Sequence, residues 1–212
     1  MIHELAIITF IVCIATYFVF FYLNKIKRNP SQRNVMRLIY ANWVEERLND
    51  DSVLTGVQAL RNFMMGNSSF ISALLILLGL LVGFYSGGFL DETVIFNSLT
   101  TGLVQISSII VVISYCLVNF ILSLRFTTRL SLLITGNPRK YSIKKIEGIN
   151  VAKRTFISAQ NHWMLGVRGL FFMIATLLWL VNPILFIISS VLITVYLIAF
   201  HDFWSLLKPN PE

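Results

Sequence analysis

Apolar residues gather in five long runs along the chain, separated by polar or charged stretches. The runs cover residues 5–23, 63–85, 104–124, 162–181 and 184–203. Each holds about twenty residues, the length at which a helix crosses a hydrocarbon core about 30 Å thick. The sequence therefore predicts an all-α fold: a polytopic integral membrane helical bundle with five transmembrane helices. We expect residues 1–212 to form a single membrane domain.

The last two runs need a break between them. From His162 to Phe203 the only charged residues are Arg168 and Asp202, and one helix over this length would be roughly 60 Å long. Near the middle lies Asn182-Pro183. Proline removes a backbone donor and disfavours helical geometry in the residue before it. We therefore expect a transmembrane hairpin that turns here. The alternative is four spans, with a kinked last helix.

Residues 32–49 predict a different kind of helix. Apolar side chains recur there at a spacing of three to four residues and form one stripe: Val35, Met36, Ile39, Tyr40 and Trp43. This pattern is typical of an amphipathic helix at the cytoplasmic headgroups, with Trp43 as an interfacial anchor. A helix that binds a protein partner is the other interpretation of the same stripe.

Charge follows the connections between the apolar runs. The net charge is +7, and if the N-terminus lies outside and the C-terminus in the cytoplasm, all 17 Lys and Arg residues fall on the cytoplasmic side. The richest segment is a predicted basic cytoplasmic loop over 125–161, which we expect to attract anionic lipid headgroups. Orientation in a cell membrane therefore explains the basic composition, and we expect no nucleic-acid partner.

Catalytic and metal-binding motifs do not stand out in the sequence. Cys13 and Cys116 each lie inside an apolar run, as small packing residues do. The sequence has no phosphate-binding glycine loop, no HExxH and no nucleophile elbow. We therefore expect no enzyme activity, no metal and no cofactor.

Polar side chains inside the apolar runs are candidates for function, because burying them in a membrane is costly. Some, such as Gln105, Asn119 and Ser123, are expected to bond to neighbouring helices or to their own backbone. Others should lie near the cytoplasmic face at similar depth, on either side of the hairpin or at the entry of the second span. They form a candidate ligand-binding set: Arg61, Asn62, Asn161, His162, Arg168, His201 and Asp202.

Three interpretations of this set remain open. It can be purely structural, with interfacial histidines and snorkelling arginines. It can form a pocket for a small, anionic solute. A haem or metal site would require His162 and His201 to face one cavity.

From residue 36 to 204 the chain resembles an uncharacterised membrane-protein family, the domain of unknown function 599 family. The matching stretches are NWVEERLNDDSVLTGVQALRNFMMGNSSFISALLILLGLL, SLRFTTRLSLLITGNP and NHWMLGVRGLFFMIATLLWLVNPILFIISSVLITVYL. The third is the most specific, since it combines Gly166, Arg168, Trp179 and Pro183 in the expected order. The resemblance implies a membrane helical fold and supplies no activity.

Two functions fit these observations. The first is a non-catalytic scaffold or accessory subunit of a larger membrane complex, with protein partners or further copies of the chain in the membrane. It is favoured by small residues along the second run, which suit close helix packing: Gly66, Ser69, Ala73, Gly79 and Gly83. The alternative is a transporter or channel for a small anion, with a cytoplasm-facing pocket of arginine and histidine.

Overall fold

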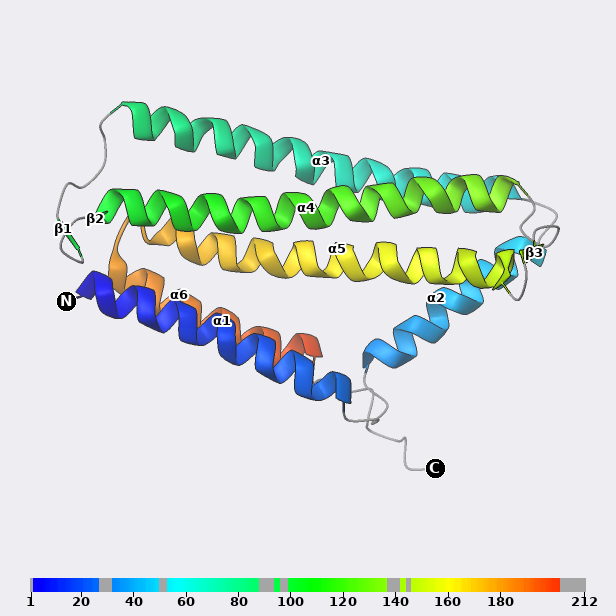
Figure 1. The fold of residues 1–212 in the computed structure, drawn as a ribbon, viewed down its shortest axis with the longest axis horizontal. Helices are drawn as coiled ribbons and strands as arrows, with labels where there is room; N and C mark the ends of the chain where they lie inside the picture. Colours follow the sequence, from blue (N-terminus) through cyan, green and yellow to red (C-terminus); the bar gives the residue numbers. More distant parts are fainter. Residues whose placement is uncertain are drawn as a thin grey trace. The chain divides into compact units, whose positions relative to one another are not determined.

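The computed structural model describes residues 2–26, 32–49, 53–87, 94–95, 99–136, 142–143 and 146–202. It is an all-α structure, as predicted (Figure 1). Its helices are α1 Ile2–Ile26, α2 Gln32–Asn49, α3 Val53–Ser86, α4 Thr101–Thr135, α5 Gly148–Leu178 and α6 Pro183–Tyr196. Helix α6 continues into a π-helical turn, η2 Leu197–Asp202. Two antiparallel strand pairs are two residues per strand: β1 Val94–Ile95 with β2 Leu99–Thr100, and β3 Ser142–Ile143 with β4 Ile146–Glu147.

Three helical segments in the described part of the chain are long and apolar enough to cross a membrane. They are Ile2–Phe20 of α1, Val53–Ser86 and Thr101–Thr135, and Pro183–Ala199 is a shorter apolar helix. Helices of this kind satisfy their own backbone hydrogen bonds and can therefore lie in lipid. The chain thus has the helices of a membrane-inserted protein.

Helices α3, α4 and α5 are longer than the apolar runs that predicted them. They have 34, 35 and 31 residues, which corresponds to about 50 Å and exceeds a hydrocarbon core by about 20 Å. The structure therefore differs from the predicted loop over 125–161, because residues 125–135 and 148–161 are helical. The polar composition of this region concealed a helical pattern in which Leu130 and Ile134, and again Ala152 and Phe156, lie four residues apart on buried faces.

The helices contribute to two compact units. The first unit comprises residues 1–35, 77–114 and 168–212, and the second comprises 36–76 and 115–167.

In the first unit, α1 packs along α6. The buried face of α1 carries Ala6, Phe10, Cys13 and Tyr17, which are spaced three or four residues apart. The ring of Phe10 lies 5.1 Å from that of Phe186 on α6 and 6.2 Å from that of Phe172 on α5. These aromatic contacts join the three helices into one apolar core.

The predicted reversal at Asn182-Pro183 is confirmed. Helix α5 ends at Leu178, and Asn182 caps α6 by accepting a hydrogen bond from the backbone N–H of Ile184, at 2.7 Å. Its φ of −159° is extended, and proline follows at the first helical position, where no donor is lost. Helix α6 then runs back along α5, so that the rings of Phe171 and Tyr196 lie 5.7 Å apart.

The second unit has a core made by four helices. It contains Val44 of α2, Leu60 of α3, Leu130 and Ile134 of α4, and Ala152 and Phe156 of α5. On the surface beside this core, Lys153 forms an ion pair with Glu45 at 2.6 Å. These contacts attach α2 to the rest of the unit.

The predicted helix over 32–49 is therefore present, but its stripe contacts protein. The rings of Tyr40 and Trp43 lie 5.4 Å and 4.9 Å from Phe156, and burial raises the pKa of Tyr40 above its usual value. Leu38 and Ile39 remain 65% and 49% exposed. Trp43 thus packs against α5, which its stripe alone does not reveal, because Phe156 lies more than a hundred residues away in the sequence.

Candidate functional site

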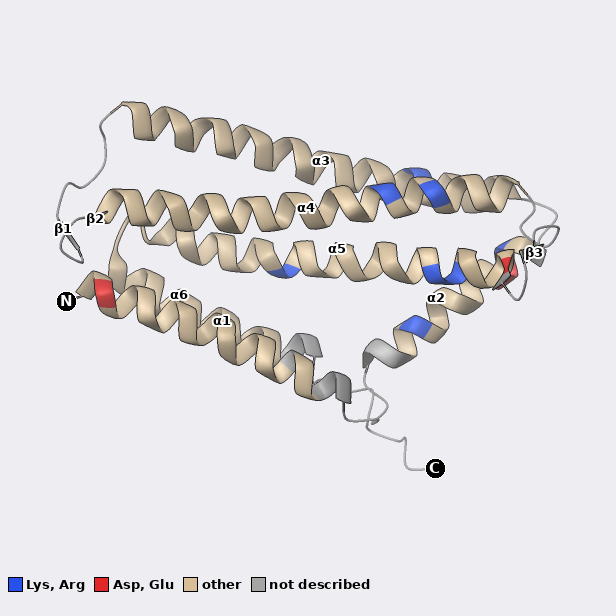
Figure 2. Cartoon of the chain, in the orientation of Figure 1, with Lys and Arg blue, Asp and Glu red and all other residues tan. Residues whose placement is uncertain are grey.

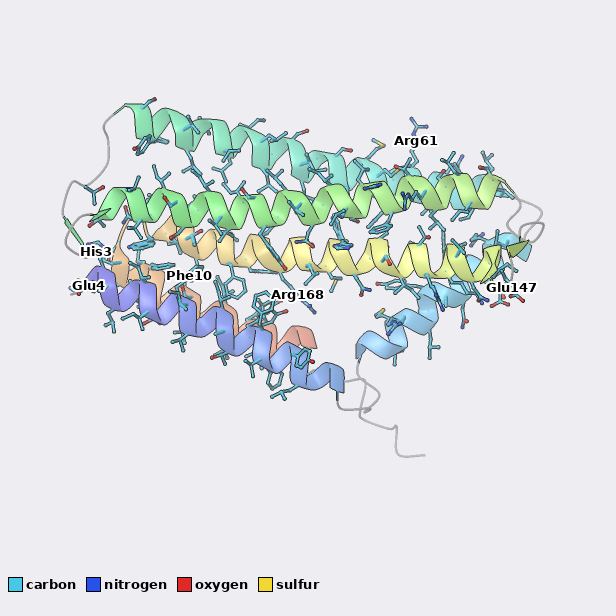
Figure 3. The ribbon with its side chains drawn as sticks, in the orientation of Figure 1. His3, Glu4, Phe10, Arg61, Glu147 and Arg168 are labelled. Atoms are coloured by element: carbon cyan, nitrogen blue, oxygen red, sulfur yellow. The ribbon has the colours of Figure 1, made fainter. Side chains whose placement is uncertain are left out.

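Arg61 and Asn62 lie on α3 with exposed side chains. Arg61 points away from the neighbouring helices (Figure 3). These two candidates therefore lie on the surface of the second unit. Among the described residues they line no interior polar site.

His162 is bound inside the second unit. Its Nδ1 lies 3.0 Å from Oδ1 of Asn119 on α4, and its ring stacks on Phe126 with centroids 5.6 Å apart. The amide nitrogen of Asn119 donates to the carbonyl of Tyr115, so Oδ1 is the acceptor and Nδ1 of His162 is the donor. When the ring is neutral, this tautomer leaves Nε2 as an acceptor. The adjacent candidate, Asn161, is half-buried.

Arg168 belongs to the first unit and is only 8% exposed. Its guanidinium carbon lies 6.0 Å from the ring centre of Tyr17, at the edge of cation–π range (Figure 3). Phe172 lies one turn further along α5, and its ring is 5.9 Å from that of Tyr17. Among the described residues of this unit, Arg168 is the charged side chain that is buried.

His201 and Asp202 have helical backbone in η2, and their side chains lie outside the described residues. Of the seven candidates, the structure thus places Arg61, Asn62, Asn161 and His162 in the second unit, and Arg168, His201 and Asp202 in the first. A pocket shared by all seven stays a prediction.

A second polar network lies at the hairpin turn of the first unit. The side-chain amide of Gln105 on α4 donates to the carbonyl of Trp179, at 3.1 Å. The indole N–H of Trp179 in turn donates to Nδ1 of His3 on α1, at 3.4 Å. Since the indole also stacks on Phe186 at 4.6 Å, this one side chain contacts α1 and α6 while its backbone binds α4. Gln105 thus bonds outside its own helix, to the turn that follows α5.

Helix α4 places more polar side chains in the interior of the second unit than the sequence indicated. Asn119, Ser123 and Thr127 follow one another at intervals of four residues and are all buried. Asn67 on α3 is also fully buried. The four-residue spacing was the signal in the sequence, because it places the three side chains on one helical face.

One face of α3 is left open by the rest of the described chain. Its exposed residues follow a spacing of alternately four and three residues, and most of them are small: Met65, Ser69, Ser72, Ile76, Gly79, Gly83 and Ser86. We call these seven residues the α3 seam. An added Cβ at Gly79 or Gly83 would meet no described atom within 4 Å. The apolar window of α3 is 11% buried, against 44% for that of α4.

Gly166 has the opposite environment. A Cβ added there would lie 2.9 Å from the ring of Phe120, so the absence of a side chain lets α5 approach α4 closely. The ring of Phe120 is held on its other sides by Phe70, at 5.2 Å, and Trp163, at 5.4 Å. It cannot move without disturbing both contacts.

Basic residues on the described helices are concentrated in the second unit (Figure 2). They include Arg61 on α3, Arg125 and Arg129 on α4, and Lys153 and Arg154 on α5. The parts of α3 and α4 that belong to the first unit carry no lysine or arginine. Each of these two helices therefore has one basic half and one half free of lysine and arginine.

Together, these helices define an all-α protein with basic segments and with apolar helices long enough to cross a membrane. Over residues 5–206 the chain matches a family described as "Protein of unknown function, DUF599", and it belongs to this family. The resemblance seen in the sequence is thus confirmed and extends to α1. No curated protein and no solved structure matches the chain.

We predict that Gly166→Ala lowers the free energy of unfolding by about 1–3 kcal/mol, because the new methyl group collides with the fixed ring of Phe120. Unfolding by SDS titration of the detergent-solubilised protein measures the change. Gly79→Ala is the matched control and should not lower stability, because the added methyl group meets no described atom and alanine is the better helix former. Equal stability of the two variants would contradict the close approach at Gly166.

Proposed function

We propose that the chain crosses the membrane five times, through α1, α3, α4, α5 and the α6–η2 segment. The N-terminus then lies outside and the C-terminus in the cytoplasm. The reversal at Asn182 supports this topology, since α6 and η2 together span residues 183–202, about 30 Å of helix. The basic halves of α3 and α4 support the orientation, because cytoplasmic segments are enriched in lysine and arginine. The same basic residues would contact anionic lipid headgroups.

A cysteine introduced as Lys208→Cys tests the topology. With Cys13 and Cys116 replaced, we expect an impermeant thiol reagent to leave intact cells unlabelled and to label the protein after permeabilisation. Asp91→Cys lies in the connection between α3 and α4, which the proposed topology puts outside. It is the positive control and should react in intact cells. Labelling of the Lys208→Cys protein from outside would leave four spans as the better topology.

We further propose that the protein is a non-catalytic scaffold or accessory subunit of a larger membrane complex. The observation that carries this proposal is the open α3 seam. Helices in lipid associate through close van der Waals contact, for which glycine and serine at a spacing of three and four residues are suited. At Gly79 and Gly83 the seam has no side chains, so another helix could come closest there. No described atom of the chain lies within 4 Å of a Cβ added at either position.

Bulky substitutions on the seam test this function. Gly79→Leu/Gly83→Leu should abolish association with partner subunits or further copies, because the two leucines prevent close approach of another helix. Gentle detergent extraction followed by native mass measurement gives the composition of the assembly. Ala73→Leu enlarges an exposed side chain roughly a quarter turn away from the α3 seam and should leave the assembly intact. A wild-type protein that is a lone monomer would contradict the proposal.

Transport of a small anion is the second candidate, and burial of Arg168 favours it. A guanidinium buried in a membrane protein attracts negative charge, because little water screens it. We expect wild-type protein in liposomes to pass at least one anion of a panel, and Arg168→Ala to reduce that flux at least tenfold. Arg129→Ala is the control, because Arg129 is exposed on α4 and is not one of the seven candidates. Equal background flux for wild type and Arg168→Ala would rule out this function.

A further inference from the structure

Two side-chain atoms in the second unit are fully buried and have no hydrogen-bond partner among the described residues: Oδ1 of Asn67 and Oγ of Ser123. Both residues are 0% exposed. The amide nitrogen of Asn67 donates to the carbonyl of Phe63, at 3.1 Å. Its oxygen is buried as well and accepts no hydrogen bond from a described residue.

Ser123 differs from other hydroxyl residues of the same helix. Ser108, Thr127 and Thr128 each donate to the carbonyl four residues earlier, at 2.8–3.0 Å. This local bond is the usual way in which a helix satisfies a hydroxyl away from water. The hydroxyl of Ser123 does not make it, so its Oγ is available to a group in the interior.

The contacts of α3 with α4 put the two residues at the same level along these helices. Phe70 stacks on Phe120 with centroids 5.2 Å apart, and Thr128 Oγ1 lies 3.5 Å from Met64 Sδ. The helices are therefore antiparallel. Asn67 lies midway between Met64 and Phe70 on α3, and the midpoint between Phe120 and Thr128 on α4 is Leu124, next to Ser123.

Asn67 also faces the interior by its position around α3. Phe63 precedes it by four residues and Phe70 follows it by three, so all three share one face. Both phenylalanines contact Trp163 of α5, at 5.3 and 5.4 Å. These rings close the space beside Asn67 with apolar groups, and a polar ligand there would be shielded from lipid.

We propose that Asn67 and Ser123 form the binding site of a single buried water molecule, which accepts a hydrogen bond from Ser123 Oγ and donates one to Asn67 Oδ1. Two unpaired polar atoms are the partners that a buried water needs. A metal cation would require a denser set of charged oxygen ligands, and the described carboxylates of this unit, Glu45, Glu46 and Glu147, are exposed. The water bridges α3 and α4 inside the second unit.

Water-edited solid-state NMR of the full chain in lipid bilayers tests the site. Magnetisation transferred from water should reach the side-chain amide of Asn67 in wild type, and the transfer should fall at least threefold in Ser123→Ala. Ser108→Ala is the matched control, because that hydroxyl is already bonded to Val104, and it should leave the transfer unchanged. No transfer in wild type, or equal transfer in Ser123→Ala, would overturn the proposal.

A thermodynamic cycle gives a second readout. Asn67→Leu and Ser123→Ala should each lower the midpoint of thermal unfolding, and the double variant should lower it no further than the worse single variant, since each change already removes the bridge. Asn67→Leu combined with Ser108→Ala should be additive. Additivity of Asn67→Leu with Ser123→Ala would overturn the shared water. If Asn67→Leu does not fold, the NMR comparison with Ser123→Ala still decides.

Discussion

In a lipid environment, a polar group has to find its hydrogen-bond partner inside the protein, and most details of this structure follow from that constraint. Long helices satisfy the backbone. Where α5 stops at Leu178, the carbonyl of Trp179 accepts a hydrogen bond from the side-chain amide of Gln105, and the side chain of Asn182 accepts one from the backbone N–H of Ile184 in α6. Along the helices, hydroxyl groups donate to the backbone carbonyls four residues earlier in the same helix. The turn between α5 and α6 is therefore possible in an apolar setting because two amide side chains take over the role of water.

The sequence predicted the elements that depend on local chemistry. Apolar runs of about twenty residues and the Asn182-Pro183 pair were enough for the helices and for the reversal, because helix length and capping involve neighbouring residues only. The extent of α3, α4 and α5 was not predictable in this way. Beyond the apolar runs their helices are stabilised by contacts such as Leu60 and Leu130 with Phe156, between residues far apart in the chain. For the same reason Trp43 appeared to be free for the lipid interface, although it packs on Phe156.

The candidate site was also predictable only in its local features. The distance from the hairpin turn gave the depth of each polar residue along its helix. The direction in which each side chain points around the helix was not given, since it depends on which neighbour is packed there. Arg61 thus proved to be exposed, and His162 proved to face Asn119 and Phe126. The sequence indicated Asn119 and Ser123 only as polar residues of a span, although with Asn67 they belong to the most buried polar groups of the second unit.

Three glycines of the helices fall into two kinds: Gly166 packs against the chain itself, whereas Gly79 and Gly83 lie on open surface. At Gly166 the missing side chain is filled by Phe120 of the same chain, so its role is complete within the fold. At Gly79 and Gly83 the missing side chains leave open surface on α3. This helix buries a smaller share of its apolar window than α4 does. A glycine costs helix stability relative to alanine wherever it stands. At Gly166 the close approach of two helices offsets that cost, and on α3 a second helix from outside the chain would offset it in the same way.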